Sequence, residues 1–212
     1  MAEDDGLRAR KKRETRQLIS DVATALFIER GFDAVTIAEI AEMANVSKVT
    51  VFNYFPRKED LFFDREQEMR DVACNALARR ARGQSPLTVL CDLARELVDG
   101  EHPFAKFTDG VSQFWSTVEA SPALRARARE MRDEFEADLA AMLADAAGAR
   151  KDDPAARILA GGVLTGWILA YAEALRRQRR GDAEPKVRAT FFKRLERALA
   201  IVRNGTKGTP YG

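Results

Sequence analysis

Apolar positions recur along most of this chain at intervals of three and four residues, the spacing of one helix face. The first stripe, which includes Leu18, Leu26 and Phe27, stops at Gly31, where a glycine can end a helix in the left-handed conformation. Further helical stripes occupy residues 61–83, 86–98, 104–118, 121–147, 153–180 and 185–202. No segment shows the sustained alternation with hairpin turns that strands require, so the predicted fold is all-α.

A shorter unit lies between the first two stripes. Thr36 and Glu39 form a T-x-x-E capping box, which predicts that a helix begins at Thr36. A tight turn follows at residues 45–46, and Ser47 can cap a second short helix that ends before Pro56. Two short helices that cross through such a turn, steadied by the longer helix before them, form a helix-turn-helix unit.

The second helix of such a unit enters the major groove of DNA, and flanking groups bind phosphates. Val51 and Phe55 are expected to face the core. The exposed candidates supply base-edge donors, hydroxyls and phosphate-binding cations, and they are Thr36, Lys48, Thr50, Asn53, Tyr54 and Lys58. A plain helical hairpin with a solvated outer face is the alternative.

The charge of the chain is informative near the N-terminus and not as a total. The chain of 212 residues is 46% hydrophobic and 32% charged, as expected of a folded globular protein, and its net charge of +2 is too small to indicate a partner. Residues 8–16 read RARKKRETR, six basic residues against one acid. We therefore predict a basic N-terminal arm over residues 1–14, with a solvated, disordered tail as the alternative.

The combined pattern of residues 15–63 closely resembles the DNA-binding domain of the tetracycline-repressor (TetR) family of bacterial transcriptional regulators. The motifs are G-F-x-x-x-T, then I-A-x-x-A-x-V-S, then Y-F-x-x-K-E-x-L. The resemblance implies that Thr36, residues 47–54 (Ser47 and Val49 included) and Lys58 lie against double-stranded DNA. It also implies a ligand-responsive homodimer, expected to be a repressor on a palindromic operator, whose larger C-terminal half binds a small, largely apolar effector.

Two positions depart from the commoner family pattern. Val49 stands where a small residue is frequent, and it could pack on a thymine methyl. Phe52 stands where a tyrosine often reaches a phosphate, and it has no hydroxyl, which makes Tyr54 the better phosphate candidate. These departures keep open the alternative of a helical small-molecule-binding protein without specific DNA binding.

The resemblance divides the chain into a DNA-binding domain over 15–60 and a ligand-binding and dimerisation domain over 61–204, before a tail at 205–212 that we expect to be disordered. Residues 153–180 are apolar on almost every side and contain a GxxxG pair. The family places its dimer interface on the last two helices, so we assign to it Gly162, Gly166, Leu175, Phe191, Leu195 and Leu199. An intrachain core is the alternative.

The effector pocket is predicted from aromatic residues, although aromatic side chains at such spacings are more often simple core. The candidates are Phe104, Phe107, Phe114, Trp115, Phe135, Trp167 and Tyr171. One histidine and two cysteines without metal-ligand spacing predict no metal, no cofactor and no enzymatic activity. No signal segment is visible, and the longest uncharged run is too short to span a bilayer, so we expect a cytoplasmic protein.

Overall fold

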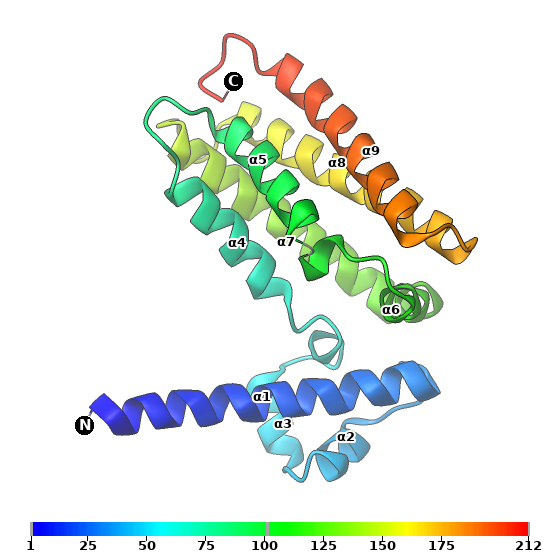
Figure 1. The fold of residues 1–212 in the computed structure, drawn as a ribbon. Coiled ribbons are helices and arrows are strands. Elements are labelled where there is room, and N and C mark those ends of the chain that lie inside the picture. The colour runs from blue at the N-terminus through cyan, green and yellow to red at the C-terminus, as the bar shows by residue number, and fades with distance from the viewer. Residues whose placement is uncertain (1, 101, 212) are drawn as a thin grey trace. The chain divides into compact units, whose positions relative to one another are not determined.

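The computed structural model describes residues 2–100 and 102–211, and every regular element within them is a helix (Figure 1), which confirms the all-α prediction. The α-helices are α1 (Ala2–Arg30), α2 (Ile37–Met43), α3 (Lys48–Tyr54), α4 (Glu66–Ala78), α5 (Pro86–Asp99), α6 (Asp109–Ala120), α7 (Pro122–Ala146), α8 (Pro154–Arg179) and α9 (Glu184–Gly205). Two short 3₁₀ helices are η1 (Glu59–Leu61) and η2 (Pro103–Ala105).

The chain forms two compact units. The N-terminal unit extends to Glu66 and also includes Gln113–Arg127, and the C-terminal unit contains Gln67–Ser112 and the chain from Ala128 onward. The boundary therefore passes through α6 and α7. The predicted domain limits at residues 15, 60 and 204 stay predictions. They describe continuous segments, whereas each compact unit combines two separate segments of the chain.

The N-terminal unit is organised around α1, which lies against α2 and η1 (Figure 1). Ile19, Ala23 and Phe27 are fully buried on one side of α1, whereas Leu18, expected in the same stripe, is 49% exposed. The buried face is therefore narrower than the sequence predicted. The predicted basic arm is not a separate tail, because residues 2–14 form the first half of α1.

Aromatic packing closes the N-terminal unit. The Phe27 ring lies 4.9 Å from Phe32 and 5.9 Å from Phe62, and Phe62 stacks on Phe114 of α6 at 4.3 Å. Phe62 and Leu61 are buried in the connection after α3, so α4 begins only at Glu66 and not at residue 61 as predicted. The apolar residues of this connection pack in the core of the helix-turn-helix unit and are not part of α4.

The C-terminal unit is a helical bundle with its own core (Figure 1). Buried side chains come from α4, α5, α7, α8 and the end of the chain, and they include Leu77, Leu90, Leu139, Leu143, Leu159 and Tyr211. Tyr211 is fully buried, and its hydroxyl donates to Asp153 Oδ2 at 2.5 Å. The C-terminal segment that we expected to be disordered is thus anchored at Tyr211 to the N-cap residue of α8.

Helices α8 and α9 lie side by side in the C-terminal unit and pack closely (Figure 1). A Cβ atom added at Gly166 would lie 2.8 Å from Ala198 Cβ, and one at Gly162 would lie 3.0 Å from Val202 Cγ2. The other predicted dimer residues are also buried within this single chain, at 0–6% exposure: Leu175, Phe191, Leu195 and Leu199. This burial agrees with the alternative of an intrachain core, and the assignment of these residues to a dimer interface stays a prediction.

The length and composition of α8 would also suit a membrane-spanning helix. This is weak evidence, because core helices of soluble proteins pass the same test. The glycine face of α8 is occupied by α9. Its GxxxG pair therefore serves close packing between two helices of the same chain.

The two glycines at 161 and 166 provide a matched test of this packing. We expect Gly166→Ala to lower the free energy of unfolding by about 1–3 kcal/mol, because the new methyl group overlaps a side chain fixed to the α9 backbone. Gly161→Ala meets the Glu136 carboxylate at 3.4 Å, and it should stabilise the helix by up to about 1 kcal/mol. Urea unfolding measures both. Equal effects of the two substitutions would show that α9 does not constrain α8.

Candidate nucleic-acid interface

The start of α2 is held by a complete capping box. The Glu39 N–H donates to Thr36 Oγ1 at 3.3 Å, and the Thr36 N–H donates to Glu39 Oε2 at 2.8 Å, as the T-x-x-E pattern predicts. The Thr36 hydroxyl also donates to Glu39 at 2.8 Å, and Arg30 donates to the same carboxylate at 2.7 Å. These bonds, that from Arg30 first, lower the pKa of Glu39 to about 2. The Thr36 hydroxyl is therefore already engaged within the chain.

Helix α3 begins with a second cap. Ser47 Oγ accepts from the Thr50 N–H at 3.0 Å and lies 2.8 Å from Thr50 Oγ1. Each hydroxyl therefore has a partner inside the first turn. Ser47 and Thr50 define where α3 starts, and they place Lys48 and Val49 at its exposed N-terminal end.

The remaining side chains of α3 divide into two faces. Val51 and Phe55 are buried at 0% and 1% exposure, as predicted. At about 100° per residue, Val49 and Asn53 lie on the opposite side of the helix, and Phe52 lies between that side and Phe55. Lys48, Val49, Phe52 and Asn53 are all exposed, whereas Tyr54 is half-buried on the flank. The outer face of α3 is therefore free to meet a major groove.

Lys58 is placed differently from the other candidates. Its ammonium donates to the Phe32 carbonyl at 2.5 Å, and its Nζ lies 4.3 Å from the centroid of the Phe32 ring and 5.6 Å from that of Phe27. Burial lowers the pKa of Lys58, although the Asp33 carboxylate acts in the opposite direction. In this geometry Lys58 connects the segment after α3 to Phe32, just after α1, and its contact with a phosphate stays a prediction.

Arg16, from the basic run, is likewise part of the fold. Its guanidinium lies 4.4 Å from the centre of the Phe55 ring, and its Nη1 donates to the Asp64 carbonyl at 3.5 Å. Arg10 pairs with Glu14 at 3.4 Å on the exposed surface of α1. Lys11, Lys12 and Arg13 are exposed there as well. The exposed positive charge of α1 thus lies before Arg16, apart from Arg30, which pairs with Glu39 at 2.7 Å.

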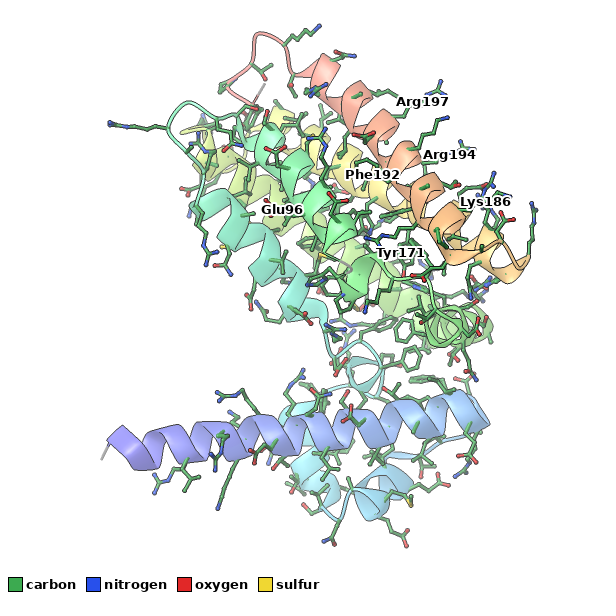
Figure 2. All side chains as sticks on the ribbon, in the orientation of Figure 1. Glu96, Tyr171, Lys186, Phe192, Arg194 and Arg197 are labelled. Carbon is green, nitrogen blue, oxygen red and sulfur yellow. The ribbon has the colours of Figure 1, made fainter. Side chains whose placement is uncertain are left out.

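The predicted pocket aromatics belong to several clusters rather than one. Phe114 and Trp115 are in the N-terminal unit, with ring centroids 5.5 Å apart. In the C-terminal unit, Phe107 and Trp167 each lie 5.2 Å from Phe191, and Tyr171, labelled in Figure 2, lies 5.9 Å from it. Phe104 instead lies 4.9 Å from His102, and Phe135 packs on the C-terminal core.

Comparison with known proteins agrees with this geometry. A family model described as bacterial regulatory proteins, tetR family, matches residues 19–64, which include α2 and α3. The transcriptional regulator TcmR of Streptomyces glaucescens is 30% identical over 154 residues, covering 70% of this chain and 67% of TcmR. The chain belongs to the TetR family of bacterial regulatory proteins. As a TetR-family member it is a DNA-binding transcriptional regulator, as predicted, and its relatives are not enzymes.

Other TetR-family relatives match the chain to different extents. LuxR of Vibrio harveyi is 48% identical, but over 46 residues that cover 22% of each protein. The structure of Thermus thermophilus FadR, a TetR-family repressor in complex with lauroyl-CoA, has a TM-score of 0.54 and 28% identity, and it covers 90% of this chain and 94% of FadR. Pseudomonas aeruginosa NalD has a TM-score of 0.54 at 21% identity over 91% of this chain and 97% of NalD, and it shows the shared fold.

One exposed residue of this TetR-family helix was given no contact of its own, although it lies within the predicted range 47–54. Phe52 was set aside as a phosphate contact because it lacks a hydroxyl, yet its side chain is 50% exposed on α3. The signal was available in the sequence, since Phe52 lies one helical turn after Val49 and Lys48. The hydrogen bond of Lys58 to the Phe32 carbonyl could not be predicted in this way. The sequence does not distinguish a solvated lysine from one that packs against the fold.

Lys58 and Lys48 should separate stability from DNA affinity. We expect Lys58→Met to lower the free energy of unfolding by about 1–2 kcal/mol through loss of the carbonyl and aromatic contacts, with little change in the salt dependence of DNA binding. Lys48→Met, at an exposed position, should weaken DNA binding and change stability by less than about 0.5 kcal/mol. Urea unfolding and salt-dependent anisotropy measure the two effects. The reverse pattern would place the Lys58 ammonium on a phosphate.

Proposed function

We propose that this regulator is a cytoplasmic homodimeric repressor that binds a palindromic operator through α3 and is released by a small, largely apolar effector. The observation that carries the proposal is the outer face of α3, capped at Ser47 and opposite the buried Val51 and Phe55. Lys48 and Asn53 on that face can donate to base edges, and α3 contains no acidic residue to repel DNA.

Phosphate contacts are the second part of the proposal. The exposed cations of α1 at Arg10, Lys11, Lys12 and Arg13 supply charge that can neutralise phosphates on either side of the bases that α3 contacts. Free N–H groups at the start of α2 remain candidates beside Thr36, although its hydroxyl would have to leave Glu39. Tyr54 stays a candidate from the flank of α3.

A second candidate for the dimer interface, beside the predicted residues, is the exposed apolar surface of α8 and α9. Ile158, Leu169 and Ile201 are 74%, 65% and 68% exposed on α8 and α9, and Ile168 adds a further exposed apolar side chain. Large apolar side chains exposed on these two helices favour burial against a second copy of the same surface. Arg194 lies about two turns before Ile201, and it projects outward from α9 (Figure 2), where it can form a polar rim.

Effector binding is supported by the C-terminal unit. Its aromatic group of Phe107, Trp167, Tyr171 and Phe191 offers apolar surface, and Trp167 and Tyr171 are half-buried rather than closed off. The fold neighbour FadR binds lauroyl-CoA, which carries a long acyl chain. A largely apolar effector of that kind would regulate DNA binding by favouring one of two conformations of the dimer.

Operator binding can be tested on DNA upstream of the protein's own gene. We expect fluorescence anisotropy to show binding at least about 10³-fold tighter than to an unrelated duplex, and weakening steeply with salt at a log–log slope of about −0.9 per phosphate neutralised. Lauroyl-CoA, compared with free coenzyme A, then probes release of the complex. Equal affinity for unrelated DNA would favour the alternative, a helical small-molecule-binding protein without an operator.

Dimerisation can be tested by one charge on the α8 surface. Leu169→Glu should convert the dimer to a monomer in analytical ultracentrifugation, because a carboxylate would replace a side chain that the partner buries. Operator affinity should fall with it, since a monomer reads one half-site. Ala189→Glu, exposed on another side of α9, is the matched control and should remain dimeric. A dimeric Leu169→Glu variant would exclude this surface as the interface.

A further inference from the structure

The outer face of α3 is apolar where a DNA-reading helix would be expected to be polar. Val49 is 68% exposed and Phe52 is 50% exposed, and the two residues are neighbours on the helix surface at a spacing of three. Val49 lies about 160° around the helix from the buried Val51 and about 120° from the buried Phe55, so it points away from the core of the N-terminal unit. Phe52 lies about 60° from Phe55, on the exposed flank beside Val49.

This apolar pair is bordered by groups that suit DNA. Lys48 precedes Val49, and Asn53 follows Phe52, so one donor lies on each side of the pair. The Ser47 and Thr50 hydroxyls are bonded to each other within the first turn and do not cover the pair. The outer face of α3 thus combines an apolar centre with polar edges.

Base edges in the major groove offer one apolar group to such a centre, the 5-methyl group of thymine. We propose that Val49 and Phe52 form a methyl-reading patch that selects thymines in each operator half-site. The inference rests on the proposed function, because it presupposes that α3 enters the major groove. It names the chemistry by which this regulator distinguishes thymine from the other bases.

A thymine contact fits the pair better than a backbone contact does. A phosphate needs a hydrogen-bond donor or a cation, and neither Val49 nor Phe52 has one. The flanking Lys48 and Asn53 can donate to guanine and adenine edges beside the thymines. The outer face of α3 would then bind an operator half-site in which thymines contact Val49 and Phe52 and other bases contact Lys48 and Asn53.

The test replaces thymine by uracil in the operator. Deoxyuridine keeps the base-pairing and major-groove acceptor of thymidine, and it removes the methyl group alone. At each contacted thymine, we expect replacement by uracil to raise the Kd about three- to fivefold, which is the effect of one buried methyl group. Thymines in the flanks of the same duplex should show no change. Anisotropy titrations on singly substituted duplexes measure each position.

Variants of the pair complete the test. Val49→Ala and Phe52→Ala should bind the thymine operator more weakly and abolish or reduce the thymine-to-uracil difference at their own positions. Leu18→Ala, which removes an exposed apolar side chain of α1, should retain the full difference. Because both α3 residues are exposed, the variants should stay folded, and urea unfolding checks this.

The outcomes separate this inference from the proposed function. Specific operator binding with identical affinity for thymine and uracil duplexes would overturn the methyl-reading patch and leave the repressor in place. A thymine-to-uracil difference that persists unchanged in both alanine variants would also overturn it, because another residue would be the reader. Failure to prefer the operator over unrelated DNA would contradict the proposed function itself.

Discussion

The helices α2 and α3, which carry most of the predicted DNA contacts, have seven residues each, and neither is long enough to persist alone in water. Their geometry depends on the apolar side chains buried in the N-terminal unit. Val51 and Phe55 fix the inner side of α3, and Ile40 does the same for α2. The long helix α1 supplies the rigid surface, through Ile19 and Phe27, that makes these short elements stable. The direction of the outer face of α3 follows from that burial.

Part of the positive charge in this region is used for the same purpose. The Lys58 ammonium joins the Phe32 carbonyl and ring, and Arg16 covers Phe55. Both cations are half-buried, and their contacts stabilise the unit that presents α3. A count of basic residues in the sequence consequently overstates the charge available to phosphates. The exposed cations of this unit include residues 10–13 of α1, Lys48 and Arg57.

Local signals in the sequence predicted local structure well. Thr36 and Ser47 cap helices where the patterns indicated, because a cap requires a specific side chain beside a specific turn. Gly31 follows α1 with φ of 83°, as a C′ glycine should. The all-α fold and the DNA-binding helix-turn-helix followed from these signals together with the family motifs.

The sequence does not show which side of a helix is buried when both sides are apolar. Helix α8 is apolar on nearly every side, so its pattern does not tell which side meets α9 and which remains exposed. The small residues Gly162 and Gly166 face the neighbouring helix of the same chain, and the larger Ile158 and Leu169 face outward. The burial of Tyr211 was equally invisible, because its partner Asp153 is distant in the chain.

The contact of Gly166 with Ala198 has a mechanical consequence. Because the two helix backbones approach until a single added methyl group would overlap, α8 and α9 cannot slide past each other without a change in backbone path. We therefore expect the two helices to move as one rigid body. A conformational change caused by a bound effector would then reach them through the helices that pack on them. The exposed isoleucines of α8 and α9 would keep their spacing during that change.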